Sequence, residues 1–221
     1  MADIFREVDE DLRRDRLGRL WSRFAPYIIG VAVLIVAGTA GFRGWEAWQA
    51  QRAETAGDAF LAALEEADAG NHAKAREMLT DMNDATGGYP LLARMRAAAE
   101  LAAEGDAAAA VSEFDAIAND RSASSVNRDL ARVRAGYLAL DLEDRSSVEA
   151  RVSIVTDGNH ALRHSAREIM ALAAWKAGDA KTASTWVSEI QADTETPADV
   201  VNRARVLESL LAAAGADGVA N

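Results

Sequence analysis

Residues suited to catalysis or metal binding are sparse in this 221-residue chain, which has three histidines and no cysteine. His160, His164 and Glu168 follow one another at intervals of four residues. On a continuous helix this spacing would place them on one face, an arrangement that can hold a divalent metal. A metal-dependent enzyme is therefore one hypothesis to weigh. A solvated charged helix face is the simpler interpretation of the same residues.

Other candidate catalytic groups lack the partners that they would need. Ser122, Ser124 and Ser125 cluster in a predicted linker with no histidine nearby in sequence to activate them. Trp175 and Trp186 fall on predicted helices, where packing is a more ordinary role than ligand stacking. No glycine-rich phosphate loop follows a strand, because no strand pattern of useful length occurs. The sequence predicts no catalytic constellation, no cofactor and no enzymatic activity.

An uncharged apolar stretch runs from Ala25 to Phe42 between Arg23 and Arg43. Eighteen helical residues span about 27 Å, close to the roughly 30 Å hydrocarbon core of a bilayer. We therefore predict a transmembrane helix over residues 24–43, with Pro26 in its first turn, where its missing N–H is of little consequence. The residues assigned to the membrane anchor are Pro26, Ile28, Ile29, Val33, Leu34, Ile35 and Trp45.

Basic residues are distributed unequally on the two sides of this stretch. Five arginines lie within eleven residues before it, and Arg43 and Arg52 lie within a comparable distance after it. The positive-inside rule then places a charged tail, residues 1–23, in the cytoplasm and residues 44–221 on the far side of the membrane. The aromatic residues expected at the two interfaces are Trp21, Tyr27, Phe42, Trp45 and Trp48.

A cleaved signal peptide is the competing interpretation of the amino-terminal region. The small residues of Gly38-Thr39-Ala40 suit the positions before a cleavage site. Against cleavage, the positive region is long and contains many acidic residues, and the apolar stretch exceeds the usual length of about 7–15 residues. The sequence favours an uncleaved anchor.

The part of the chain after the apolar stretch is acidic. The first 43 residues hold seven of the 24 basic and six of the 35 acidic residues, so the remainder carries 17 basic and 29 acidic side chains. Such a surface repels nucleic-acid phosphates. The composition therefore argues against a nucleic-acid partner and is compatible with a membrane-tethered protein.

A repeated motif organises residues 50–215. Four segments align without gaps, starting 38, 35 and 38 residues apart, and each begins with Ala-Arg and reaches an Asp thirteen residues later. The pairs are Ala93 with Asp106, Ala131 with Asp144, Ala166 with Asp179, and Ala204 with Asp217. Internal repetition at this period is typical of helical repeat proteins. The register turns Ala166 inward, so we expect His164 and Glu168 to point to solvent.

A second helical pattern follows each motif. Counted from Asn71, Asp106, Asp144 and Asp179, the eighth and eleventh residues are apolar and the fourth is mostly small. Gly70, Gly105 and Gly178 fall where a first helix must end, and the residue after each suits the N-cap of the second. The sequence thus predicts an all-α solenoid of about four helix–turn–helix units, with a single last helix after Pro197.

This unit resembles the tetratricopeptide repeat, whose period is 34 residues. The resemblance covers nearly all of residues 50–215, although most of the Trp and Leu-Gly positions of the repeat consensus are missing here. It implies a concave surface that binds segments of other proteins. Tethering that surface to a membrane raises its effective concentration near membrane partners.

The order of parts, and the run Gly41-Phe42-Arg43-Gly44-Trp45 after the apolar stretch, resemble the YfgM-like family of ancillary subunits of the bacterial Sec translocon. The resemblance implies a single-pass protein of the bacterial inner membrane with a cytoplasmic amino terminus and a periplasmic repeat domain. It also implies as partners the translocon subunits, a membrane-anchored periplasmic prolyl isomerase chaperone and secretory polypeptides. The alternative is a repeat scaffold that coordinates cell-envelope or division complexes.

Overall fold

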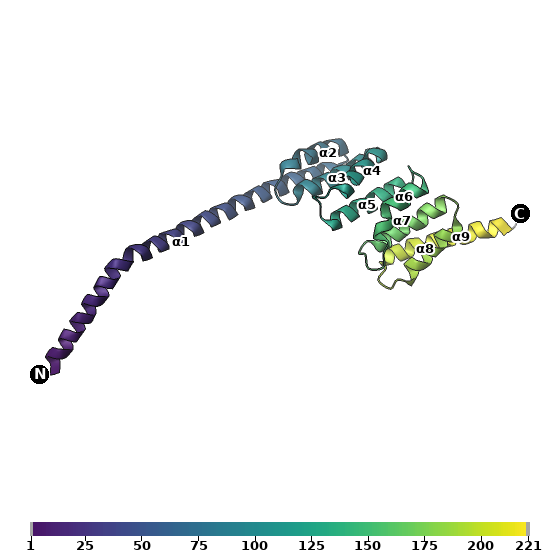
Figure 1. The fold of residues 1–221 in the computed structure, drawn as a ribbon. Coiled ribbons are helices and arrows are strands. Elements are labelled where there is room, and N and C mark those ends of the chain that lie inside the picture. Colours follow the sequence, from purple (N-terminus) through teal and green to yellow (C-terminus); the bar gives the residue numbers. More distant parts are fainter. Residues whose placement is uncertain (1, 220–221) are drawn as a thin grey trace. The chain divides into compact units, whose positions relative to one another are not determined.

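The computed structural model describes the backbone of residues 2–219 and the side chains of residue 21 and residues 23–214, and this part of the chain is helical without a strand. The chain divides into two compact units, residues 1–54 and residues 55–221. The first helix, α1 (Ala2–Asp68), supplies residues to both units (Figure 1).

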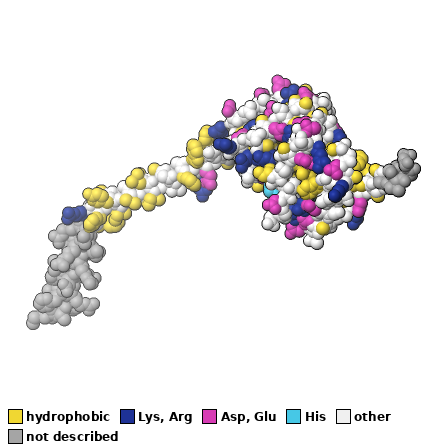
Figure 2. All heavy atoms as spheres, turned by 45° about the vertical axis from the view of Figure 1, so that its right-hand side comes forward, with side chains coloured by type: hydrophobic (Ala, Val, Ile, Leu, Met, Phe, Trp, Pro, Cys, Tyr) yellow, Lys and Arg dark blue, Asp and Glu magenta, His cyan; other side chains and the backbone are white. Residues whose placement is uncertain are grey.

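In the first unit, the described side chains of α1 are exposed almost throughout. Ile28 is 50% and Leu34 is 71% exposed, and Figure 2 shows hydrophobic side chains along this part of the helix. Among the described residues, α1 is the one helix long and apolar enough to cross a membrane, with a mean hydropathy of 2.0 over its most apolar window. An exposed apolar surface of this extent requires a non-aqueous environment or a partner.

The prediction that Pro26 opens a helix is wrong, because α1 begins at Ala2 and contains Pro26 in its interior. The residues before Pro26 include many Leu, Arg and Glu, which favour helix formation, so the helix starts upstream of the apolar stretch. Pro26 lacks an N–H, so α1 loses the backbone hydrogen bond to the carbonyl of Ser22 and yet continues through this position. The helix also continues beyond residue 43, to Asp68.

The second unit is a stack of antiparallel helix pairs. After the end of α1 come α2 (His72–Thr80) with the short 3₁₀ helix η1 (Asp81–Asp84), α3 (Tyr89–Ala103), α4 (Ala107–Asn119), α5 (Ser125–Ala139), α6 (Arg145–Val152) with η2 (Ser153–Val155), α7 (Arg163–Lys176), α8 (Ala180–Ala192) and α9 (Ala198–Val219). Within the described residues this makes four pairs and a single last helix (Figure 1). The predicted all-α repeat solenoid is confirmed.

The turns inside the pairs follow the predicted chemistry with one exception. Asp106, Asp144 and Asp179 each accept a hydrogen bond from the backbone N–H three residues on, at 3.0, 2.9 and 3.0 Å. These bonds satisfy amide groups that the first turn of a helix leaves free. Asn71 differs, because its side chain donates to Glu66 at 2.8 Å and makes no cap. The three helix-ending glycines have positive φ angles, as at Gly105 with +92°.

The predicted inward positions form the core. The alanines of the motif are at most 3% exposed, namely Ala93, Ala131, Ala166 and Ala204. The small residues at the fourth position of the second helices, Ala75, Ala110, Val148 and Ala183, are at most 1% exposed. The apolar residues at the eighth and eleventh positions are also buried, namely Leu79, Phe114, Val152, Val187, Met82, Ile117, Val155 and Ile190. Small residues let neighbouring helices approach closely, while larger ones fill the layers between them.

Candidate protein-binding groove

An apolar groove of about 260 Å³ lies between α7, α8 and α9. Its lining residues are Glu168, Ala171, Leu172 and Trp175 of α7, Val187 and Ile190 of α8, and Arg203, Ala204, Val206, Leu207 and Leu210 of α9. A pocket for a drug-sized ligand typically encloses about 300–1,000 Å³. This groove is slightly smaller, a size that suits one or two apolar side chains of a protein segment.

The repeat register brings the rim of the groove together. Leu172 and Trp175 lie six and nine residues after the motif alanine of α7, and Val206 and Leu210 lie two and six residues after that of α9. Residues at this spacing share one face of a helix. Trp175 is 39%, Leu210 is 45% and Val206 is 60% exposed. Below this exposed rim, Val187 and Ile190 form a floor that is at most 2% exposed.

One wall of the groove carries a polar network that connects α5, α7 and α9. Tyr137 Oη donates to Glu168 Oε2 at 2.7 Å, and Arg203 Nη2 donates to the same oxygen at 2.8 Å. Arg203 Nη1 also donates to Asp199 at 3.0 Å. Burial and the bond to the Glu168 carboxylate raise the pKa of Tyr137, so its hydroxyl remains a proton donor. The Arg203 guanidinium compensates the buried Glu168 carboxylate, so this pair adds no net charge to the lining of the groove.

A second ionic cluster fixes the connection between α8 and α9 against α7. Asp193 Oδ2 accepts from Arg163 Nε at 2.7 Å and from Arg167 Nη1 at 3.1 Å. Thr196 Oγ1 donates to the carbonyl of Ile190 at 2.8 Å and lies 3.0 Å from His164 Nδ1. The hydrogen bonds from Arg163 lower the pKa of Asp193. The cluster thereby positions the start of α9, and with it the α9 side of the groove.

The expectation that His164 and Glu168 point to solvent is wrong, since they are 6% and 4% exposed. Their helix, α7, packs against α5, α6, α8 and α9, so residues on both sides of Ala166 face a neighbouring helix. Desolvation, followed by the nearby Arg163 cation, lowers the pKa of His164. The repeat motif predicts which one face of a helix is buried, whereas a helix inside the stack contacts neighbouring helices on several faces.

The metal hypothesis meets a further contradiction. His160 lies in the turn before α7, which begins at Arg163, so it does not share a helix face with the other two residues. His160 Nε2 lies 3.1 Å from Asp129 Oδ2, while His164 contacts Thr196. Across the described side chains, no three His, Asp or Glu residues are grouped to hold a metal ion.

Two of the three serines and the second tryptophan have structural partners. Ser124 Oγ caps α5 by accepting from the N–H of Asn127 at 3.3 Å, and Ser122 Oγ donates to Asp120 at 2.6 Å. Ser125 is the first residue of α5. Trp186 packs between two apolar clusters of the core. Sequence reasoning missed the exposed rim of the groove, because the positions of its residues in the repeat do not show how far α7 and α9 separate.

Comparison with known families identifies the fold class of the chain. A model of the tetratricopeptide repeat-like domain matches residues 19–167, about two thirds of the chain. The chain belongs to the tetratricopeptide repeat-like domain family. No curated protein and no solved structure matches it. Tetratricopeptide repeat-like domains are typically non-catalytic modules of protein interaction. The match includes the apolar part of α1 and ends in α7, so α8 and α9 lie beyond the matched residues.

Proposed function

We propose that this protein is a membrane-anchored scaffold without catalytic activity, which holds an apolar segment of a partner protein in the groove between α7 and α9. The observation that carries the proposal is the exposure of Trp175, Val206 and Leu210 over a buried apolar floor. Tryptophan is among the residue types that most often concentrate binding energy in protein interfaces, and the apolar side chains around Trp175 can exclude water from the contact. The size of the groove supports one or two anchor side chains and modest affinity.

The proposed topology places residues 1–23 in the cytoplasm, a membrane span at residues 24–43 and a periplasmic repeat domain at residues 44–221. The exposed apolar surface of α1 and the arginines before it support this arrangement. Confinement to the membrane compensates for a small contact area, because a tethered partner is present at high effective concentration. Protease added outside spheroplasts should remove the repeat domain and spare the tail. The reverse cleavage pattern would refute this topology.

The partner that we propose is the Sec translocon, with the protein acting in the handover of secretory chains to a membrane-anchored prolyl isomerase chaperone. The resemblance of the layout and of the run Gly41 to Trp45 to the YfgM-like family supports this assignment. Emerging secretory chains are unfolded and expose apolar side chains of the kind that the groove fits. A bacterial inner-membrane location follows from the same proposal. The alternative, a scaffold of envelope or division complexes, also needs protein partners but predicts enrichment at midcell.

Site-specific photo-crosslinking in cells tests the proposal. Benzoylphenylalanine placed at Val206 of the full-length protein should crosslink to translocon subunits, the chaperone or secretory chains. The matched control is Ile154, which is 66% exposed on η2 and is not part of the groove. In addition, Leu210→Glu should reduce co-purification of these partners without changing the fold. Equal crosslinking from Val206 and Ile154 would refute the groove, and crosslinks to division proteins alone would favour the alternative.

A further inference from the structure

Trp45, Trp48 and Arg52 form a stripe on α1 directly after the apolar stretch. Intervals of three and four residues place them on one face of the helix. Trp45 and Trp48 are 57% and 47% exposed, and their ring centroids are 5.1 Å apart with a tilt of 42°. The guanidinium carbon of Arg52 lies 4.8 Å from the centroid of Trp48. The three side chains thus make a continuous aromatic and cationic surface that faces solvent.

The stripe is directed back toward the apolar stretch. Helical side chains lean toward the amino-terminal end of their helix, and Arg52 reaches one turn back to cover Trp48. Trp45, Trp48 and Arg52 follow Phe42 by three, six and ten residues, so their backbone positions lie about 4.5, 9 and 15 Å beyond it along the helix. Each headgroup layer of a bilayer is about 5–7 Å thick. With the hydrocarbon core ending at Phe42, Trp45 lies within this layer. Because helical side chains lean toward the amino-terminal end, the Trp48 ring and the guanidinium folded over it lie at the outer edge of the layer.

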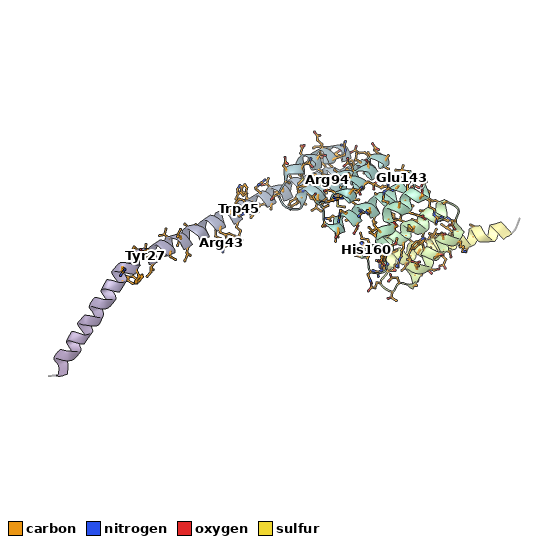
Figure 3. The ribbon with its side chains drawn as sticks, in the orientation of Figure 1. Tyr27, Arg43, Trp45, Arg94, Glu143 and His160 are labelled. Carbon is orange, nitrogen blue, oxygen red and sulfur yellow. The ribbon has the colours of Figure 1, made fainter. Side chains whose placement is uncertain are left out.

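The charges of this segment distinguish Arg52 from its neighbour Arg43. Arg43 Nη1 donates to Glu46 at 3.0 Å, so a carboxylate compensates it within the segment. Among the described contacts, Arg52 covers an indole face instead. Stacking uses the plane of a guanidinium and leaves its N–H groups, which lie at the edge, available to an anion. Arg43 and Trp45 also leave α1 on different sides (Figure 3).

We propose that this stripe binds the headgroup phosphate of an anionic phospholipid, with Trp45 and Trp48 in the interfacial layer and Arg52 donating to the phosphate oxygens. The planar fork of an arginine suits phosphate, and indole rings prefer the headgroup region of a bilayer. The proposal rests on α1 spanning a membrane, and it is independent of the translocon as a partner.

Lipid-dependent quenching of tryptophan fluorescence tests the proposal. The full-length protein, carrying Trp21→Phe, Trp175→Phe and Trp186→Phe, emits only from the stripe. It is reconstituted into vesicles of equal parts phosphatidylglycerol and phosphatidylcholine, in which one or the other lipid is brominated. We expect brominated phosphatidylglycerol to quench the stripe more strongly than brominated phosphatidylcholine. One arginine near an anionic surface corresponds to about a fivefold local enrichment.

Two substitutions and a control define the outcomes. Arg52→Gln should abolish the preference for phosphatidylglycerol, and Arg52→Lys should retain only part of it, because lysine keeps the charge without the planar fork. Arg205→Gln removes an equal charge from an exposed position on α9 and should leave the preference intact. Equal quenching by the two lipids would overturn the headgroup site while leaving the anchor in place. No quenching by either lipid would overturn the site together with the proposed span.

Discussion

Gly136 of α5 lies where α5 approaches α6 and α7 closely, and it gives a sharp test of the packing. A Cβ atom at this position would lie 2.7 Å from Val152 Cγ1 and 3.1 Å from Ile169 Cδ1. Val152 and Ile169 are both 0% exposed, and the side chain of Val152 is stiff because it is branched at Cβ. A methyl group at residue 136 therefore requires the backbone of α5 or α6 to move.

The net effect of Gly136→Ala is the difference between two opposing terms. Overpacking a close contact typically costs about 1–3 kcal/mol of stability. Replacing glycine with alanine inside a helix contributes about 1 kcal/mol in the favourable direction. Since the neighbouring atoms belong to fully buried side chains, we expect the upper part of the overpacking range and a net loss of about 1–2 kcal/mol.

Urea unfolding of the full chain in mild detergent, followed by helical circular dichroism, measures this difference. Val152→Ala alone should cost about 2–3 kcal/mol through lost burial and a cavity. The double variant should be more stable than the sum of the two losses implies, by about 1 kcal/mol or more, because the new methyl group occupies the vacated space. Gly158→Ala is the control, since nothing lies within 4 Å of its Cβ position. A gain in stability from Gly136→Ala, or strict additivity in the double variant, would refute the close approach.

Four further predictions concern the caps, two residues of the ionic cluster and the membrane helix. Asp106→Ala should lower the free energy of unfolding by about 1 kcal/mol, because α4 loses its N-cap. Asn71→Ala should lower it less, because Asn71 makes no side-chain cap. Chemical denaturation of both variants measures this ranking. The pKa of Asp193 is lowered in the folded chain, so its stabilising effect is complete above about pH 4 and is lost as the pH falls further. The unfolding midpoint of Asp193→Asn should therefore depend less on pH in this range. An acid dependence equal to that of the unsubstituted chain would contradict the cluster. The folded chain also lowers the pKa of His164, so stability should begin to fall below about pH 6.5, and His164→Gln should remove that part of the pH profile. Leu34→Arg should weaken membrane insertion by about 3–4 kcal/mol, the difference between an arginine and a leucine at the helix centre, and shift the protein into the carbonate-extractable fraction. Full retention in the membrane pellet would argue against a span at this position.

The fold was predictable because its repeats carry a few characteristic residue types in the same order. An inward alanine, a glycine with positive φ and a capping aspartate recur in register, as at Ala166, Gly178 and Asp179, and each has a local physical role. Local signals do not determine where a long helix begins. The start of α1 depends on the residues before Pro26 as a whole, and a single proline does not prevent the helix from continuing.

The groove was less predictable, because it arises from how far successive helices separate. Trp175 looks like a packing residue in sequence, and its 39% exposure depends on the space between α7 and α9. In the same way, Glu168 and Arg203 are 35 residues apart, and only the stacking of first helices from neighbouring repeats makes them an ion pair. Periodicity assigns a residue to a face of its own helix, whereas the contacts of that face depend on the neighbouring helices.

The position of α9 at the end of the stack has a consequence for how binding would be observed. Among the described side chains, its apolar contacts form one cluster with α7 and α8, to which the ion pair of Arg203 with Glu168 is added. In a linear array each layer is stabilised by its immediate neighbours, so the terminal layer opens most readily. Each transient detachment of α9 also removes one side of the groove. An occupant would therefore slow hydrogen–deuterium exchange of the amides of α9 and leave the exchange of central helices such as α4 unchanged.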